Sequence, residues 1–324
     1  MVNKIDLIDK KILSELDKNC RITETQLAKK VGRSREAVKY RIKQLEEKGI
    51  IIDYITSLNP NKLGYYMFKV YLKLENIPKE KEKFYKFLKT NKNIYWYCIS
   101  DGAFDCVFAI LSKEIIRYFD MINELLSQWE HLIISKVLGT MVDTRQYNKK
   151  FFLNEKKGTL AIFGGDIINN KMDTLDSKIL NILANEARIP ITELSRKVNS
   201  TIEIVRTRIK KLEKEGIILG YRISVDYNKL GLEYFKAIIY FRTLTRKEEM
   251  ALFEWMKNHP QSLYYIRSLA PWEVEFEFVV ENYLEFNKII NELREKFPKV
   301  IRNHEHLIII HEEWLPGYKE FIKN

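Results

Sequence analysis

The chain begins with three short segments in which apolar residues recur every three or four positions, the spacing of amphipathic helices. The segments cover residues 5–16, 24–31 and 35–48. Their apolar stripes are Ile8, Ile12, Leu13 and Leu16 in the first, Leu27 and Val31 in the second, and Val38, Ile42 and Leu45 in the third. Because a tight turn separates the second helix from the third, the pattern predicts a helix-turn-helix.

The residues at the ends of these segments support this division. Thr23 is placed to cap the second helix, and Gln26 can close a capping box with it. Gly32 can take the left-handed conformation that ends this helix, and Ser34 is placed to cap the next one. Gly49 ends the third helix. Local chemistry therefore predicts where each helix begins and ends.

A β-prone stretch follows the third helix. Ile50-Ile51-Ile52 begins it, residues 54–58 continue it, and the polar run Asn59-Pro60-Asn61 ends it. We interpret this stretch as a small β hairpin. Three helices and a hairpin make a winged helix-turn-helix.

From Tyr66 the chain alternates β-prone and helical segments. The expected elements are a strand at 66–74, a helix at 79–90, strands at 94–99 and 104–111, a helix at 113–129 and a strand at 132–142. This βαββαβ order predicts a ferredoxin-like sandwich, with both helices on one face of an antiparallel sheet. The other face also looks apolar and aromatic, with Tyr95, Tyr97 and Phe108, so we expect another sheet or domain to cover it.

The pattern then repeats, and from Asp9 to Gly64 the two copies align with a shift of 167 residues and without a gap. The run from Asp9 to Leu13 matches the run from Asp176 to Leu180, and Arg41-Ile42-Lys43 matches Arg208-Ile209-Lys210. A second βαββαβ pattern follows from residue 234 to residue 311. The sequence therefore predicts an α+β chain in which two winged helix-turn-helix domains alternate with two ferredoxin-like (βαββαβ) sandwich domains.

The expected boundaries follow from this repeat. They are a winged helix-turn-helix at 1–62, a ferredoxin-like domain at 63–143, a linker at 144–171, a second winged helix-turn-helix at 172–229, a second ferredoxin-like domain at 230–316 and a tail at 317–324. The linker contains a short apolar piece that can add a strand to one neighbour.

Composition narrows the choice of partners. The 324 residues carry a net charge of +11, which favours polyanions, nucleic acid first and membrane surfaces second. We find no apolar run of about 20 residues and no signal segment. Cys20, Cys98 and Cys106 have no metal-type spacing, and packing is a better account of the last two than a disulfide. A reducing cytoplasm is the simplest location.

The third helix of each unit presents a basic, hydrogen-bonding front opposite its apolar stripe. In the first unit this front contains Arg35, Glu36, Lys39, Tyr40 and Lys43. Such a helix fits a DNA major groove, although an isolated basic helix is more often an ordinary solvated surface. The presence of the same motif twice favours DNA.

Taken together, these residues resemble the Lrp/AsnC family of bacterial and archaeal transcription regulators, duplicated in one polypeptide. The resemblance is carried by Leu7-Ile8-Asp9, Arg21-Ile22, Leu27, Val31-Gly32-Arg33-Ser34, the run from Arg41 to Glu46 and Gly49-Ile50-Ile51, and the same pieces recur in the second half. It implies that the winged domains bind double-stranded DNA, that the ferredoxin-like domains serve effector binding and oligomerisation, and that the chains form a dimer.

In that family each third helix enters a major groove, with half-sites about 34 Å apart or a multiple of that. The resemblance therefore places base contacts at Arg35, Glu36, Lys39 and Tyr40, and a phosphate contact at Lys43. The matching residues of the second unit are Ile202, Glu203, Arg206, Thr207 and Lys210. Because the two sets differ, we expect one chain to prefer a non-palindromic site. Arg41 and Arg208 suit an ion pair as well as a phosphate contact.

The resemblance also places a small effector, often an amino acid, at the turn between the second and third sandwich strands. In unit one the residues of this turn are Ser100, Asp101, Gly102, Ala103 and Asp105. A plain hairpin turn that needs glycine for its backbone angles explains the same residues equally well. In unit two the turn contains Pro271 and lacks the glycine, so effector binding is not expected there.

Motifs for an enzyme are weak. We find no nucleophile motif and no phosphate-binding glycine loop, and expect no metal site, no cofactor and no enzyme activity. Two alternatives stay open. One is a siroheme-decarboxylase-like tetrapyrrole enzyme, which resembles the same two-part unit and would use Arg267, His304 and His306. The other is an architectural protein that compacts DNA without sequence preference.

Overall fold

In the computed structural model, which describes residues 3–156, 158–168 and 170–314, both halves of the chain begin with three helices. In the first half these are α1 (Leu7–Lys18), α2 (Glu24–Val31) and α3 (Arg35–Glu47). In the second half they are α6 (Thr174–Asn185), α7 (Ile191–Lys197) and α8 (Ile202–Lys214). The helix positions predicted for the first unit are confirmed to within one or two residues.

The predicted caps are confirmed as well. The Thr23 side chain accepts a hydrogen bond from the backbone N–H of Gln26, and Gln26 closes the capping box. Gly32 has a left-handed φ of 68°, and the Ser34 side chain caps α3. In the second unit Asn199 takes the left-handed conformation at the position of Gly32, with a φ of 52°. A short polar residue can adopt this conformation at low cost.

The predicted wing hairpin is wrong. Each unit supplies a single wing strand, and β1 (Ile51–Leu58) pairs antiparallel with β7 (Ile218–Val225) of the other unit. In unit one the short helix η1 (Pro60–Lys62) follows at once, so no second strand is available to satisfy the backbone groups of β1. The two winged domains therefore share one two-stranded sheet, and their apolar side chains form one continuous core.

The rest of each unit has the predicted βαββαβ order, which confirms the ferredoxin-like fold. Unit one contains β2 (Tyr66–Leu74), α4 (Pro78–Thr90), β3 (Ile94–Gly102), β4 (Cys106–Ser112), α5 (Ile115–Ser127), η2 (Glu130–Leu132) and β5 (Ile133–Tyr147). Unit two contains η4 (Asn228–Leu230), β8 (Glu233–Phe241), α9 (Arg246–Asn258), β9 (Ser262–Leu269), β10 (Val274–Val280), α10 (Tyr283–Lys296) and β11 (Ile301–Trp314). Each fourth strand is longer than expected.

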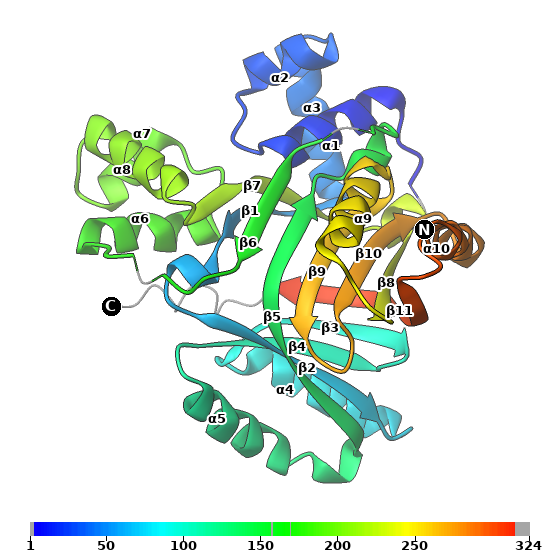
Figure 1. Cartoon of the computed structure of the whole chain (residues 1–324). Helices are drawn as coiled ribbons and strands as arrows, with labels where there is room; N and C mark the ends of the chain where they lie inside the picture. The colour runs from blue at the N-terminus through cyan, green and yellow to red at the C-terminus, as the bar shows by residue number, and fades with distance from the viewer. Residues whose placement is uncertain (1–2, 157, 169, 315–324) are drawn as a thin grey trace.

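These long fourth strands join the two units. The second half of β5 pairs with β9, and the second half of β11 pairs with β3. Because β2 also pairs with the first half of β5, the strands of the two sandwiches form a closed double sheet. Figure 1 shows α4 and α5 outside one side of it, α9 and α10 outside another, and the winged domains above. The fold is thus a dimer-like arrangement within one chain.

The space between the two sheets is the covered apolar face that the sequence predicted. Tyr95 lies in this shared core, but Tyr97 and Phe108 pack under the helices of unit one. A register shift between Ile94 and Trp96, where a bulge reverses the side-chain alternation of β3, puts Tyr97 on the other face from Tyr95, and Phe108 of β4 lies opposite Tyr97 in the strand pair. Two of the three aromatic residues that we assigned to this face are therefore on the opposite one.

The segment from 144 to 171, expected as a linker, is held by the folded units. Its residues up to Tyr147 belong to β5, η3 (Lys150–Phe152) follows, and β6 (Leu160–Gly164) pairs with β5. The Lys149 Nζ donates to Asp17 Oδ1 at 2.8 Å and to the Ile223 carbonyl at 2.9 Å. The tail expected at 317–324 lies outside the described residues.

All three cysteines are buried and free, and Cys98 and Cys106 lie on opposite faces of the sheet of unit one. Among the helices that the structure describes, none combines the length and apolar character needed to cross a membrane.

Candidate nucleic-acid interface

The third helix of the first unit presents its predicted front to solvent. Val38, Ile42 and Leu45 are buried in the core of the winged domains. On the opposite side Arg35, Glu36, Lys39, Tyr40 and Lys43 are all exposed. Tyr40 is 65% exposed, which is unusual for a large aromatic side chain that has no external partner.

The cations of this helix differ in how free they are. Arg35 Nε lies 3.1 Å from Glu24 Oε2, and Lys43 Nζ lies 3.6 Å from Glu47 Oε1. Both pairs are solvent-exposed and therefore weak. Within the described residues Lys39 has no ion pair or hydrogen bond. Of the three cations, Lys39 needs the least rearrangement to contact an external anion.

The third helix of the second unit is built in the same way but carries different chemistry. Glu203, Arg206, Thr207 and Lys210 are exposed, whereas Ile202 is half-buried. Arg206 and Lys210 have no ion pair or hydrogen bond to any residue that the structure describes. The front of α8 thus has two cations where the front of α3 has three.

Arg41 and Arg208 serve the structure. Arg41 Nη1 donates to Asp6, the N-cap residue of α1, and to Asp9 within α1, at 2.8 Å in both cases. Arg208 Nη1 lies 2.7 Å from Asp173 at the start of α6. The backbone N–H of Asp9 and the Arg41 guanidinium lower the pKa of Asp6. These ion pairs attach each third helix to its first helix.

The two winged domains also hold each other in place. The Thr56 hydroxyl of β1 donates to the Leu183 carbonyl of α6 at 2.6 Å. In the other direction the backbone N–H of Cys20 donates to the Tyr221 carbonyl of β7. Together with the shared wing sheet and the common core, these contacts set the separation of α3 and α8.

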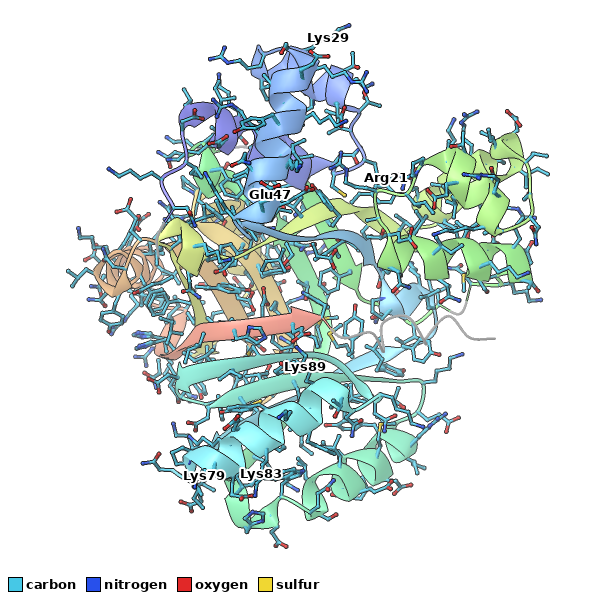
Figure 2. The ribbon with its side chains drawn as sticks, turned by 180° about the vertical axis from the view of Figure 1, so that it is seen from behind. Arg21, Lys29, Glu47, Lys79, Lys83 and Lys89 are labelled. Atoms are coloured by element: carbon cyan, nitrogen blue, oxygen red, sulfur yellow. The ribbon has the colours of Figure 1, made fainter. Side chains whose placement is uncertain are left out.

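Basic residues are not confined to the winged domains. Figure 2 shows Lys29 near the outer tip of the first winged domain, while Lys79 and Lys83 lie on α4 at the opposite end of the molecule. The net charge of the chain therefore does not by itself identify a DNA-binding face, whereas the exposed fronts of the two third helices do distinguish one.

The residues of the predicted effector turn lie together, and most of their polar groups already have partners. The Ser100 hydroxyl donates to the Phe104 carbonyl at 2.9 Å, and Asp105 accepts from Lys81 Nζ at 2.8 Å. Gly102 pairs with β11, and a Cβ atom added to it would lie 2.6 Å from the His306 carbonyl oxygen. Close approach of β11 therefore explains the glycine. The effector site at this turn stays a prediction.

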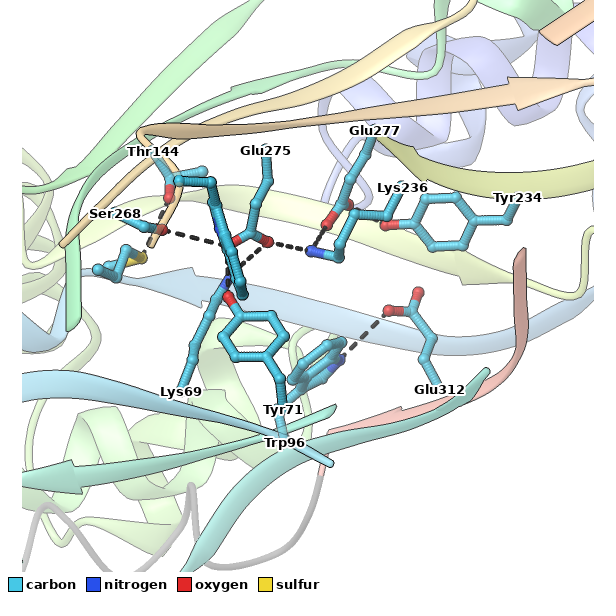
Figure 3. Close-up of polar contacts among 12 residues, drawn as sticks. Lys69, Tyr71, Trp96, Thr144, Tyr234, Lys236, Ser268, Glu275, Glu277 and Glu312 are labelled. Atoms are coloured by element: carbon cyan, nitrogen blue, oxygen red, sulfur yellow. Dashed lines mark hydrogen bonds and ion pairs between the residues drawn. The ribbon is translucent and has the colours of Figure 1, made fainter. Parts of the chain in front are cut away.

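A charged cluster that we did not predict from the sequence is buried between the two sheets (Figure 3). Lys69 of β2 and Lys236 of β8 meet Glu275 and Glu277 of β10 there. Lys69 Nζ lies 3.0 Å from Glu275, and Lys236 Nζ lies 2.5 Å from both glutamates. The tyrosine hydroxyls of Tyr71 and Tyr234 donate to Glu275 and Glu277, respectively.

Charge pairing decides the ionisation of this buried cluster. Burial alone would raise the pKa of Glu275, but the ammonium groups of Lys236 and Lys69 lower it well below its ordinary value. Burial alone would lower the pKa of Lys236. The carboxylates of Glu275 and Glu277 have a larger effect, so the pKa of Lys236 is raised. Lys69 has one carboxylate partner, Glu275. For this lysine the effect of burial is larger than that of the carboxylate, so its pKa is lowered.

A signal for this cluster was present in the sequence. Lys69 and Lys236 are separated by the repeat shift of 167, and each lies between apolar neighbours in the middle of a strand. The alternation of Glu275 and Glu277 with phenylalanine is typical of a strand with one solvated face, which hides the burial. Two lysines at one repeat position in buried strands should have predicted buried acids nearby.

A solved enzyme structure has the same fold with two duplicated units in one chain. The siroheme decarboxylase NirDL, solved alone and in complex with an iron-uroporphyrin III analogue, matches 98% of this chain and 97% of its own. The TM-scores are 0.63 and 0.62. At 11% sequence identity this similarity shows a shared fold only. We predicted from the sequence that the chain is not an enzyme. That prediction is wrong, because an enzyme has the same two-unit arrangement and the fold does not exclude enzyme activity.

Two of the three residues that we named for a tetrapyrrole, Arg267 and His306, already contact other side chains of the chain. The Arg267 guanidinium is held by Asp143 at 2.7 Å and by Glu249 at 3.0 Å. The His306 ring lies against Phe286, with ring centroids 5.5 Å apart.

Sequence comparisons identify the family. The model of winged helix-turn-helix DNA-binding domains matches residues 5–52 and 172–218. The proline dehydrogenase transcriptional activator of Rhodobacter capsulatus is 34% identical over 134 residues, which cover 41% of this chain and 87% of that protein. The regulator LrpA of Pyrococcus abyssi is 47% identical over 35% of this chain and 67% of its own length. LrpA of Pyrococcus horikoshii is 50% identical, with 20% of this chain matching 47% of that protein. The chain belongs to the Lrp/AsnC family of DNA-binding transcriptional regulators, with the two-part unit of that family present twice in one polypeptide.

Proposed function

We propose that the chain binds double-stranded DNA by placing α3 and α8 in two major grooves at once. The observation that carries this proposal is that both third helices present free cations on their outer faces, while the winged domains share a sheet and a core. Base contacts come from Arg35, Glu36, Lys39 and Tyr40 on α3, with Lys43 on phosphate. On α8 the contacting residues are Ile202, Glu203, Arg206, Thr207 and Lys210.

The preferred site of such a chain is not a palindrome. The exposed Tyr40 of α3 corresponds to Thr207 of α8, whose hydroxyl donates to the Glu203 carbonyl at 2.9 Å. Arg35, which can make two hydrogen bonds to guanine, corresponds to the apolar Ile202. Ile202 suits a thymine methyl group instead. The two half-sites therefore differ in sequence.

The test is a pair of charge reversals. Lys39→Glu with Arg206→Glu should weaken binding to the preferred duplex by about fivefold to hundredfold per residue, since one good base contact is worth about 1–3 kcal/mol. The matched control reverses Lys79 and Lys83 on α4, which changes the net charge equally at the opposite end of the molecule (Figure 2). Fluorescence anisotropy at several salt concentrations measures both variants.

The outcome decides between three functions. Loss of binding in the first variant alone supports sequence-reading by α3 and α8, whereas equal losses in both variants indicate binding by overall charge, as expected of a compacting protein. Undiminished binding by the first variant contradicts the proposal. An absorbance titration with iron uroporphyrin III tests the enzyme alternative, because a saturable Soret shift in a protein that does not retain DNA would replace the proposal.

We also propose that two chains associate further, as the resemblance to Lrp/AsnC regulators implies. Light scattering on the purified protein tests this, because a single chain has a mass of 38.7 kDa. A monomer that still binds DNA would show that one chain is sufficient.

A further inference from the structure

A cavity of about 800 Å³ lies between the shared wing sheet and the open end of the double sheet. Strands β1 and β7 form one wall. Tyr95, Tyr234, Tyr264 and Glu312 contribute to the opposite wall, and Tyr227 lies at the junction. The volume is within the range of about 300–1,000 Å³ that is usual for small-molecule sites. Glu46 near the end of α3 is part of its lining, whereas the exposed fronts of α3 and α8 and the predicted effector turn are not.

The cations of the cavity wall already have partners within the chain. Lys149 binds Asp17, and Arg222 Nη1 donates to the Tyr147 carbonyl at 3.0 Å. Lys89 Nζ lies 3.1 Å from Glu313, and Lys229 Nζ donates to the Lys48 carbonyl at 3.0 Å. A ligand that relied on these groups would have to break existing pairs. The wall is therefore poorly suited to a carboxylate or a phosphate.

Acceptor groups, by contrast, are free. Glu312 Oε2 accepts a hydrogen bond from Trp96 Nε1 at 3.2 Å, and its Oε1 has no partner among the described residues. The Tyr227 hydroxyl likewise makes no hydrogen bond to the described part of the chain. The Tyr264 hydroxyl accepts from Gln146 Nε2 at 2.5 Å and keeps a lone pair. The ionised Glu312 carboxylate can only accept, and the tyrosine hydroxyls can accept as well as donate, so a ligand that donates hydrogen bonds fits this wall.

The rings of the wall favour a positive charge as well. The rings of Tyr227 and Tyr234 meet at 66° with centroids 5.3 Å apart, and Tyr264 lies beside them on the cavity wall. Aromatic faces around a carboxylate attract ammonium groups through the ring quadrupole. Burial and the neighbouring Glu277 raise the pKa of Glu312 to about 7, so an incoming cation would stabilise its charged form.

We propose that this cavity binds a small molecule with a protonated amine, whose ammonium group contacts the free oxygen of Glu312 among the rings of Tyr227, Tyr234 and Tyr264. One chain has one such site. The corresponding residue of β5 is Thr144, which lies opposite Ile266 of β9 as Glu312 lies opposite Cys98 of β3, and its hydroxyl is buried against the Met141 sulfur at 3.1 Å. Because β1 and β7 line the cavity, a bound amine also contacts the sheet that joins the two winged domains. The site does not depend on DNA binding by α3 and α8.

The experiment compares three ligands of one shape on the full chain by isothermal titration calorimetry. Tryptamine is cationic, tryptophol is neutral and indole-3-propanoate is anionic. We expect tryptamine to bind at least about tenfold more tightly than either of the others, because a hydrogen bond to a charged group is worth about 1.5–3 kcal/mol. Equal binding of the three, no binding of tryptamine, or a preference for the anion would overturn the proposal.

Two variants locate the site. Glu312→Gln keeps the size of the side chain and should reduce tryptamine affinity about tenfold to hundredfold, leaving tryptophol unaffected. Glu305→Gln is the matched control, since Glu305 lies on the same strand, is exposed and bonds to Tyr240 at 2.9 Å outside the cavity. Equal losses in both variants would overturn the assignment. So would displacement of tryptamine by iron uroporphyrin III, because that ligand presents carboxylates to the wall.

Discussion

Replacing Lys236 by methionine tests how the buried charge cluster is held. Lys236 lies 2.5 Å from Glu275 and 2.5 Å from Glu277 between the two sheets. Without it, Glu277 keeps the Tyr234 hydroxyl as its partner among the described residues, and Glu275 keeps Lys69 at 3.0 Å. One carboxylate is then left buried without a counter-charge. Removing one partner of a buried pair costs about 3–5 kcal/mol, and we expect this loss for Lys236→Met.

The repeat supplies a matched comparison. Lys69 occupies the same position in unit one but contacts Glu275 alone. After Lys69→Met, Glu275 keeps Lys236 and the Ser268 hydroxyl at 3.1 Å, so both carboxylates remain paired. We therefore expect this variant to lose about 1–3 kcal/mol, the usual worth of a hydrogen bond to a charged group. The order of the two losses is the prediction.

Urea unfolding followed by tryptophan fluorescence and by circular dichroism measures both losses. The double variant Lys236→Met with Glu277→Gln removes one charge of each sign and should recover part of the stability lost by Lys236→Met alone. A loss for Lys69→Met that equals or exceeds the loss for Lys236→Met would refute the reasoning. Losses below about 1 kcal/mol for both would show that water reaches the cluster.

Three further predictions concern single positions. Gly102→Ala should cost about 1–3 kcal/mol because the new Cβ would lie 2.6 Å from a backbone oxygen of β11, whereas Gly216→Ala, with a φ of 69° and open space around it, should cost about 1 kcal/mol in the same unfolding assay. The raised pKa of Glu312, about 7 in the fold, means that the free energy of unfolding falls as pH rises from about 4.5 to 7, by at most about 3 kcal/mol, and then levels off. His259, with a pKa lowered to about 4, makes the free energy of unfolding rise with pH over the same range. The measurement is therefore the difference in free energy of unfolding between wild type and Glu312→Gln as pH changes. A difference that stays constant with pH would contradict the prediction. Thr23→Ala should cost about 1 kcal/mol through loss of the capping box of α2, and an unchanged melting curve would show that the cap is not needed.

The parts of the fold that could be predicted from sequence are those decided by neighbouring residues. Helix boundaries followed from Thr23, Gln26 and Gly32, because caps act over one helical turn. The βαββαβ order followed from the spacing of apolar segments, and the repeat doubled the number of observations. The exposed fronts of α3 and α8 were also predictable, because the buried stripe of a helix determines which residues face outward.

The features that could not be predicted depend on which distant strands meet. The wing strand β1 has the same composition whether it folds back on itself or pairs with β7, and nothing local distinguishes the two. The bulge of β3 places Tyr95 and Tyr97 on opposite faces, although residues two apart in a regular strand share a face. The cavity that contains Glu312 exists because the wing sheet lies over the double sheet, a contact with no sequence pattern.

Duplication within one chain explains why the buried cluster is asymmetric. In unit one Lys69 lies opposite Ala109 in the β2–β4 pair, whereas in unit two Lys236 lies opposite Glu277 in the β8–β10 pair. Two identical subunits related by a two-fold axis would have to carry the same acids on both sides. A fused chain is free of that requirement, so β10 can supply both carboxylates for two lysines that meet between the sheets. The same freedom allows α3 and α8 to read different half-sites, and it allows Glu312 to have no acidic counterpart at Thr144.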